Sequence, residues 1–475
     1  MPTRLPVIAV FDIGKTNKKL LVFDVHYNVV KEEQIRFEEI ADDDGFPCED
    51  LNRLAAWVLE QFRQLKKAPE FQLRAVNFST YGASVVCLDK RGKVAGNLYN
   101  YLKPYPAEVQ KIFEEERGNA ALFSQETSTP LMGHLNAGLQ LYWIKKKKPD
   151  LFDQTAHVLH LPQYLCFLLT GKKFAEMTSV GCHSAMWNFK QMQYHSWLKE
   201  ERVLPKLSMV VPGSHVVPVM NEYTGETVTT GIGLHDSSAA VIPYLLCFKE
   251  PFVILSTGTW SVSLNPFNTT LPAGRELAGG CLSYLSYQGC PVKTSMLFAG
   301  NDHDTQVLRI AEHFHVPGDF FKNVPLDPGY IRKIRMQNRV QALQKEDRAF
   351  SPTTPGVFHS RALSGFSSAG EAYHQLVADI IARQQQTSQM VLDGSDVNRV
   401  YVDGGFCRNG IYMQLLANAF PGKEVYAASM IQGTALGAAL AIHTHWNREA
   451  VPENLVRLRR WPLEQPLPCS ATSQL

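Results

Sequence analysis

Residues 252–264, FVILSTGTWSVSL, constrain the fold of this chain more than any other segment, because they join two apolar strand-like runs through a short polar turn. Gly258 in that turn allows backbone conformations that other residues avoid, so that backbone amides can approach an anion. Ser256, Thr257 and Thr259 add hydroxyl donors beside it. The segment therefore predicts a β-hairpin that cradles phosphate.

A second segment of the same design lies near the N-terminus. Residues 7–25, VIAVFDIGKTNKKLLVFDV, form an apolar run, a polar turn around Gly14 and another apolar run. The chain therefore carries two hairpins whose turns can each offer amides and hydroxyls to phosphate. The turn residues expected to contact phosphate are Gly14, Lys15, Thr16, Asn17, Thr257, Gly258 and Thr259.

Two other nucleotide-binding motifs fit the sequence poorly. The run Gly14-Lys15-Thr16 resembles the end of a P-loop, but that motif needs a glycine at the position of Ala9 and a helix after the threonine. The glycines at 231 and 233 start a dinucleotide fingerprint, but Asp236 stands where its third glycine belongs. We therefore expect neither a P-loop nor a Rossmann site.

Composition limits the class of protein. A chain of 475 residues exceeds one ordinary hydrophobic core, so two domains are expected. The 47 basic and 45 acidic residues nearly cancel, which gives no electrostatic reason to expect a nucleic-acid or membrane partner. The nine cysteines are scattered without a CxxC pair, which favours reduced thiols and a cytoplasmic protein. Asp12 interrupts the first apolar run before a signal-peptide core is complete.

The order of periodic segments predicts the organisation of both domains. Strands are expected at 6–13, 18–25 and 30–38, followed by a helix at 50–67 and a strand at 73–79, which is how a ribonuclease H-like domain begins. Residues 91–214 read as a mostly helical cap on the substrate side. A new pattern starts near residue 248, so we place the domains at 1–248 and 249–475.

The second domain alternates helices and strands, which suits a sheet covered by helices. Residues 314–365 hold many prolines and charges and are expected to form an irregular insertion. After it come a helix at 370–392, a strand at 400–403, a helix at 409–420, a strand at 423–427 and a helix at 430–443.

Two carboxylates stand where chemistry is expected. Asp12, at the tip of the first hairpin, can hold Mg²⁺ through water, or it can cap its own turn. Asp236, in the segment TGIGLHDSSAA, can accept a proton from a hydroxyl during phosphoryl transfer, or it can cap the helix that follows. We favour Mg²⁺ binding for Asp12 and the role of general base for Asp236.

A third candidate nucleotide element is VDGGFCRN at 402–409. Gly404 and Gly405 end a strand before a helix, so exposed backbone there can pack against adenine, ribose or phosphate, with Asn409 nearby. A tight strand-to-helix turn without a ligand is the simpler alternative. Residues 432–439, QGTALGAA, form a further run of mostly small residues.

Taken in order, these five motifs resemble the FGGY carbohydrate kinases of the actin-like ATPase group, and the resemblance covers nearly the whole chain. It implies an α/β protein with two ribonuclease H-like domains and an interdomain cleft. It also implies ATP and Mg²⁺ as cofactors and transfer of the γ-phosphoryl group to a sugar hydroxyl. The His235-Asp236 pair followed by small residues is most similar to the rhamnulose and fuculose kinases.

The resemblance places the sugar on loops of the first domain, with a ketose as the expected substrate. The expected sugar-binding residues are Tyr81, Gly82, Ser84, Gln163, His235 and Asp236, the last of which is also the expected catalytic base. Ser84 and Gln163 stand where the family often has acidic residues, so the sugar is expected to differ from those of the well-known members.

Two alternatives stay open: an actin-like ATPase without a sugar site, and a sugar-binding relative without catalysis. Sugar-induced release of ADP separates them from a kinase. The expected partners are a small sugar and ATP, and a homodimer is compatible with them. The polar run 301–304, NDHD, is expected to be a loop rather than a metal cluster, and His157 and His160 are expected on opposite faces of a strand.

Overall fold

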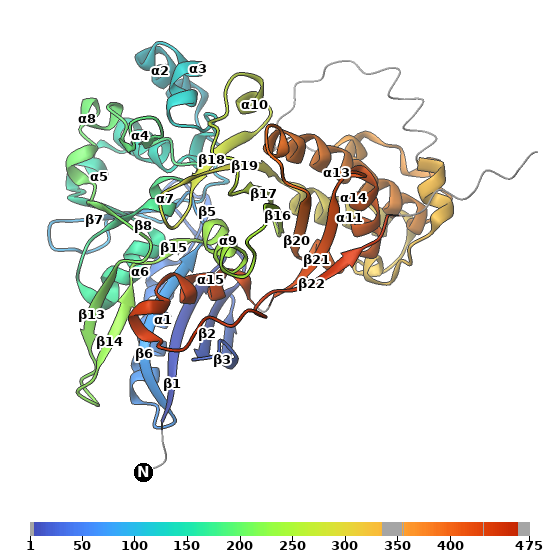
Figure 1. Cartoon of the computed structure of the whole chain (residues 1–475). Helices are drawn as coiled ribbons and strands as arrows, with labels where there is room; N and C mark the ends of the chain where they lie inside the picture. Colours follow the sequence, from blue (N-terminus) through green and yellow to red (C-terminus); the bar gives the residue numbers. More distant parts are fainter. Residues whose placement is uncertain (1–3, 335–353, 355, 431, 464–475) are drawn as a thin grey trace, which may run out of the picture. The chain divides into compact units, whose positions relative to one another are not determined.

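We describe a computed structural model of the chain that covers residues 4–334, 354, 356–430 and 432–463. The chain forms two compact units (Figure 1). Unit 1 comprises residues 1–250, 266–294 and 430–456, and unit 2 comprises 251–265, 295–429 and 457–475. The chain thus leaves unit 1 next to the expected boundary at residue 248 but returns to it twice.

The sheet of unit 1 is built on three antiparallel strands, β1 (Leu5–Ile13), β2 (Lys18–Asp24) and β3 (Val29–Ile35). β6 (Phe71–Thr80) lies parallel to β1, and β14 (Thr227–Gly231) lies parallel to β6. β13 (Val216–Met220) extends the edge beyond β14, and β15 (Leu234–His235) pairs with the end of β6. The strands at the start follow the predicted order.

Apolar side chains fix the strands and helices of unit 1. β1 is almost entirely buried, as expected for a strand covered on both faces, and α1 (Leu51–Lys67) buries a stripe of leucines and aromatics after its N-cap Asp50. The remaining elements before the last strands of the sheet are β4 (Ile40–Ala41), β5 (Pro47–Cys48), β7 (Val85–Leu88), α2 (Ala107–Arg117), α3 (Ala120–Glu126), η1 (Gly133–Leu135), α4 (Ala137–Lys147), α5 (Pro149–Gln154), β8 (His157–His160), α6 (Leu161–Thr170), β9 (Ala175–Glu176), α7 (Met177–Val180), β10 (Trp187–Asn188), β11 (Gln193–Tyr194), α8 (Trp197–Glu200), η2 (Leu204–Lys206) and β12 (Val210–Val211).

Two helices of small residues cover the sheet of unit 1, α9 (Asp236–Cys247) and α15 (Gly433–Ala441). They lie side by side in Figure 1, α9 in green and α15 in red, and share one core with β1 and β2. A Cβ at Gly437 would lie 1.8 Å from the carbonyl oxygen of Ala239, so the helices touch backbone to backbone. Unit 1 also holds α10 (Arg275–Ala278), β18 (Cys281–Leu285) and α16 (His443–Trp446).

Unit 2 repeats the pattern of strands. β16 (Phe252–Thr257) and β17 (Ser261–Asn265) form an antiparallel hairpin, and β20 (Arg399–Gly404) lies parallel to β16. β21 (Glu424–Ser429) and β22 (Arg457–Trp461) continue the sheet. The other elements are α11 (Ala299–Phe314), η3 (Phe320–Asn323), η4 (Val357–Ser360), η5 (Leu363–Gly365), α13 (Ala369–Leu392), η6 (Phe406–Arg408) and α14 (Gly410–Ala419), and β19 (Pro291–Leu297) leads the chain back into this unit.

The structure corrects one expectation and limits another. The run 301–304 is not a loop but lies in α11, because Asp302 and His303 face inward with Gln306 and Val307 at helical spacing. The expected insertion at 314–365 falls partly on residues 335–353 and 355, which lie outside the described residues. His157 is partly exposed and His160 is buried, as their placement on opposite faces of β8 predicts. In the described part of the chain, none of the helices has the length and apolar character needed to span a membrane.

Candidate active site

Asp12 lies near the end of β1, facing the first turn of α15. Its Oδ2 accepts a hydrogen bond from the Thr434 hydroxyl at 2.7 Å. Burial raises the pKa of Asp12 to about 6, the Thr434 hydroxyl opposes this shift, and the charge of Asp236 adds to it. The two carboxylates therefore interact within unit 1, and a cation beside Asp12 would be favoured electrostatically.

Asp236 is the first residue of α9, at the end of the strand that pairs with β6. The N-cap residue is His235, whose side chain makes no capping bond, while Oδ1 of Asp236 accepts the amide of Ser237 at 2.5 Å and its hydroxyl at 3.2 Å. Burial raises the pKa of Asp236 to about 6, yet 30% of its side chain is exposed. The structure thus supplies a carboxylate that is accessible and holds its proton more tightly than an ordinary aspartate.

The turn of the first hairpin keeps its polar side chains engaged. The amide of Gly14 donates to the carbonyl of Asn17 at 2.9 Å, and the Asn17 side chain accepts from Arg36 at 2.6 Å. Lys15 pairs with Glu39 at 2.5 Å, and Thr16 is exposed. A strand follows this turn, as the rejection of a P-loop predicted.

The second lysine of this hairpin is also engaged. Lys19 donates to the Gln432 side chain at 2.9 Å and lies 3.5 Å from Glu32. Lys18 is buried and pairs with Glu49 at 2.7 Å, and it donates to the carbonyl of Lys15 at 3.0 Å. The buried ion pair of Lys18 and Glu49 therefore holds the turn of the first hairpin in place.

Four of the expected sugar-binding residues meet at one small cavity in unit 1. Its lining is Tyr81, Gly82, Ser84, His160, Pro162, Ser179 and His235. None of these side chains is a lysine, arginine or carboxylate. Burial lowers the pKa of His160 and His235 to about 4, so both rings are neutral near pH 7. The cavity therefore offers hydroxyl and imidazole groups without a net charge.

Two expected sugar contacts are used inside the protein. The Ser84 hydroxyl donates to the carbonyls of Tyr81 and Gly82, at 3.1 and 3.2 Å. The Gln163 amide donates to the carbonyl of Gly233 at 2.9 Å, while its Oε1 is buried without a partner. In this structure Gln163 does not line the cavity but holds the loop that leads to His235.

Sequence reasoning missed the support of that loop. Glu176 is fully buried and accepts from the amide of Thr178 at 2.8 Å and its hydroxyl at 2.6 Å, and burial raises its pKa to about 7. The Thr178 hydroxyl in turn accepts from the amide of His235 at 2.9 Å. Glu176 lies at the start of a short helix. The sequence alone does not distinguish it from other residues that cap a helix.

Unit 2 holds a larger cavity, of about 560 Å³ and open to solvent, which is large enough for a nucleotide. Expected phosphate and nucleotide residues line it together with residues that sequence reasoning missed. The expected ones are Thr257, Gly258, Thr259, Gly405 and Asn409, and the missed ones are Gly300, His303, Asp304, Phe321, Lys322, Val324, Phe406, Arg408 and Gly410.

The floor of this cavity is the junction of two turns. Thr257 donates its hydroxyl to the carbonyl of Asp403 at 2.5 Å and accepts the amide of Phe406 at 3.0 Å. Gly404 has a φ of 89°, and a Cβ there would lie 1.9 Å from the carbonyl oxygen of Thr257. Only glycine fits at position 404 of this junction. The structure thus gives a reason for glycine there, although Gly404 does not line the cavity. Asn409 caps α14 through the amides of Ile411 and Tyr412.

Aromatic rings and cations complete the cavity of unit 2. His303 lies edge-on to Phe321 and to Phe406, with ring centroids 5.1 and 5.2 Å apart. Lys322 and Arg408 add positive charge to the lining. The combination of rings, glycine backbone and cations suits a base and its phosphates.

Two ribonuclease H-like sheets, a hairpin turn in each and an accessible carboxylate define the class of an actin-like phosphotransferase. The models of the FGGY family of carbohydrate kinases match this chain, the N-terminal domain at residues 7–242 and the C-terminal domain at 335–444. The chain belongs to this family and is an ATP-dependent sugar kinase, so the predicted fold class and activity are confirmed.

Individual relatives agree with this assignment. The chain is 25% identical to a rhamnulokinase of Halalkalibacterium halodurans over 90% of its length and 91% of the relative. It is also 25% identical to a rhamnulokinase of Klebsiella pneumoniae, over 79% and 76%. Among solved structures, a carbohydrate kinase from Novosphingobium aromaticivorans is similar with a TM-score of 0.73 at 21% identity, covering 96% of this chain and 97% of the other. A xylulose kinase from Lactobacillus acidophilus has a TM-score of 0.78 at 15% identity, covering 97% and 94%.

Proposed function

We propose that this kinase phosphorylates a hydroxyl of an uncharged ketose, similar to rhamnulose or fuculose, with Asp236 as the general base. One observation carries the proposal: Asp236 is accessible, has a raised pKa and follows His235, which lines the cavity of the expected sugar residues. Phosphoryl transfer needs alignment, charge neutralisation and a carboxylate that accepts the hydroxyl proton. Asp236 satisfies the last of these needs.

The lining of the small cavity supports an uncharged sugar. A sugar acid would require a cation to neutralise its carboxylate, and none of the lysines or arginines that the structure describes lines this cavity. The Tyr81 ring offers a face for stacking on a sugar, while His235 and Ser84 offer polar atoms. Similarity to the two rhamnulokinases favours a ketose over an aldose.

The nucleotide is assigned to the cavity of unit 2. In this proposal the backbone at Gly258, Thr259 and Gly405 binds phosphate, Lys322 and Arg408 neutralise it, and Phe321 contacts the base. The turn Gly14–Asn17 of unit 1 stays a predicted phosphate contact, and the charge of its Lys15 is shared with Glu39.

Asp12 fits a magnesium ligand. One of its oxygens is held by Thr434, its pKa is raised by burial, and it is only partly buried, so a hydrated cation can reach it. Bound Mg²⁺ would supply neutralisation of phosphate charge. Asp12 and Thr434 would hold and orient it.

The free thiols support the proposal of a cytoplasmic setting. All eight cysteines of the described residues are free, which supports a reducing, cytoplasmic environment. Light scattering on the purified protein tests whether the chain forms a homodimer.

A coupled assay of ADP release tests the proposed function. Ketoses, aldoses, polyols and sugar acids are compared at saturating ATP, with and without Mg²⁺. We expect Mg²⁺-dependent turnover with a neutral ketose and none with sugar acids. Faster turnover with an aldonate than with any ketose would contradict the substrate assignment.

A further inference from the structure

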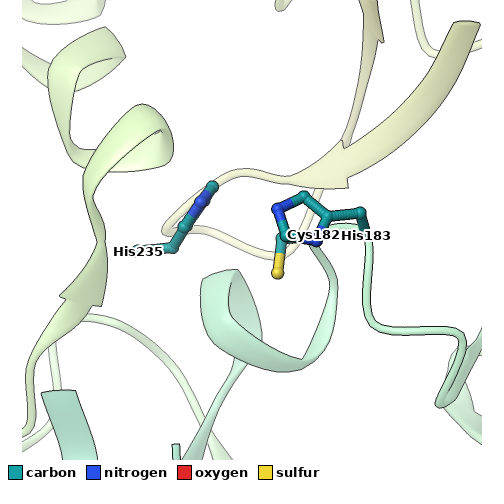
Figure 2. A group of neighbouring side chains, drawn as sticks. All are labelled: Cys182, His183 and His235. Carbon is teal, nitrogen blue, oxygen red and sulfur yellow. The ribbon is translucent and has the colours of Figure 1, made fainter. Parts of the chain in front are cut away.

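Cys182, His183 and His235 lie together in unit 1 (Figure 2). Cys182 and His183 follow α7, and His235 ends β15, so two separate segments supply the three side chains. One ligand atom from each residue lies within 4.8 Å of the other two. The three side chains are 2 to 5% exposed, so they share a nearly dry site.

The hydrogen bonds of the two rings leave a lone pair on each. Nδ1 of His183 lies 2.6 Å from the carbonyl oxygen of Leu135, which can only accept, so Nδ1 carries the proton and Nε2 is free to bind a cation. Nε2 of His235 lies 3.3 Å from Asp236, and its Nδ1 is buried and has no hydrogen-bond partner among the described residues. In metal-binding histidines, the ring nitrogen that does not bind the metal commonly donates a hydrogen bond to a carbonyl or carboxylate oxygen, and this bond orients the ring.

One thiol and two imidazoles form the ligand set that Zn²⁺ prefers, with the fourth position left to water. Ligand atoms around tetrahedral Zn²⁺ stand about 3.5 Å apart, since the Zn–N and Zn–S bonds are about 2.0 to 2.3 Å long. The three ligand atoms lie within 4.8 Å of one another, so binding requires their separations to shrink to this value. The Cys182 thiol releases its proton to solvent when the sulfur–metal bond forms. The thiolate and Asp236 then balance the two positive charges.

We propose that Cys182, His183 and His235 bind Zn²⁺ or a similar thiophilic cation, and that the bound ion blocks phosphorylation of the sugar. The binding site rests on the geometry alone. The blockade rests on the proposed function, because the ion would occupy His235 in the sugar cavity and draw the charge of Asp236, the proposed base. A small sugar and the cation would then compete.

The binding site is tested with Co²⁺ as a coloured probe of the full-length, metal-free protein. We expect one Co²⁺ per chain, with the near-ultraviolet absorption of a thiolate–cobalt bond, and its displacement by Zn²⁺. Cys182→Ser and His183→Gln should weaken binding at least about 10-fold, since even a lost outer partner of a metal ligand costs about 10- to 100-fold. Cys166→Ser, which removes another buried thiol outside the group, is the matched control and should keep the absorption.

Wild-type protein alone can overturn the site, so the test does not depend on the folding of a variant. Absence of a thiolate–cobalt band in the wild type, or an equal band in Cys182→Ser, would overturn it. If no sugar supports ADP release, the cobalt result still decides the site, and only the proposed function fails.

The blockade is tested in zinc-buffered assays, with inhibition measured relative to the zinc-free turnover of each variant. We expect Zn²⁺ to inhibit the wild type and Cys166→Ser, and to inhibit Cys182→Ser at least about 10-fold more weakly. Raising the sugar concentration should relieve the inhibition. Full turnover with the cation bound, or inhibition unaffected by sugar, would overturn the blockade.

Discussion

The turns of the two hairpins hold the same place in the two units, yet they use their residues differently. The turn of unit 1 is charged, and its lysines are already engaged with Glu39, Glu32 and Gln432. The turn of unit 2 is uncharged, and Thr257 ties it to the backbone at 403–406. One topology therefore carries two kinds of turn: charged groups near the proposed base in unit 1, and bare backbone at the proposed nucleotide cavity in unit 2.

This difference predicts where substitutions act. In unit 1, function should depend on carboxylates and change little when a paired lysine is removed. In unit 2, function should depend on the absence of side chains at the turn.

The largest effect is expected from Asp236→Asn in unit 1. Removing a positioned general base should lower kcat by roughly 10² to 10⁴. Binding of ATP, measured by calorimetry, should stay as in the wild type because Asp236 does not line the cavity of unit 2. A folded variant that keeps wild-type turnover would rule out Asp236 as the base.

The next effect is expected from Gly258→Val in unit 2. The nearest atom to a Cβ here is 3.9 Å away, so the protein can fold around it while the backbone loses contact with phosphate. Loss of one hydrogen bond to a charged group costs about 1.5 to 3 kcal/mol, or roughly 10- to 100-fold in ATP affinity. Calorimetry on Gly14→Val gives the matched measurement in unit 1. Unchanged affinity in both variants would contradict phosphate binding by the hairpins.

The pH dependence reports the carboxylates of unit 1. Asp12 and Asp236 both have pKa values raised to about 6 by burial, so each is protonated below that pH. Because the base must be ionised, kcat/KM should rise with pH up to about 6, by about tenfold per unit below it, and level off above. In Asp236→Asn the residual activity should lose this dependence or shift it. A profile that is flat from pH 5 to 7 in the wild type would contradict the assignment.

A smaller effect is expected from two neutral side chains, Ser84 in the lining of the proposed sugar cavity and Gln163, which holds the loop that leads to His235. Ser84→Ala and Gln163→Ala should raise KM for the sugar several-fold, since a neutral hydrogen bond is worth about 0.5 to 1.5 kcal/mol. ATP affinity should be nearly unchanged. Equal loss toward sugar and ATP would show that the two side chains only support the fold.

The smallest effect is expected from Lys15→Ala. Its charge is shared with Glu39, and such pairs near the surface contribute up to about 1 kcal/mol, so ATP affinity should change less than about fivefold. If Lys15→Ala lowered ATP affinity as much as Gly258→Val, the proposed difference between the two turns would be contradicted.

The sequence allows prediction of features that depend on neighbours along the chain. Alternating and continuous apolar runs place both hairpins, and the glycines at 404 and 405 mark the strand-to-helix turn. Asp236 is proposed as the base because a carboxylate there follows glycines and precedes small residues. These signals are local, and the strands and helices that carry them form at the predicted places.

Features that depend on distant segments could not be predicted. Phe321 and Arg408 meet in one cavity only after the sheet of unit 2 has formed. The run 301–304 looks polar enough for a loop, but burial against α13 makes it a helix. The engagement of Gln163 with the carbonyl of Gly233 spans 70 residues and leaves no trace in either segment.

The backbone contact between Gly437 and Ala239 gives unit 1 a rigid part. It fixes α9, which begins at Asp236, against α15, which carries the partner of Asp12. The spacing between the proposed proton acceptor and the proposed cation ligand is therefore set when the protein folds, before any substrate arrives. A residue larger than glycine at 437 would push the two helices apart and displace both carboxylates at once.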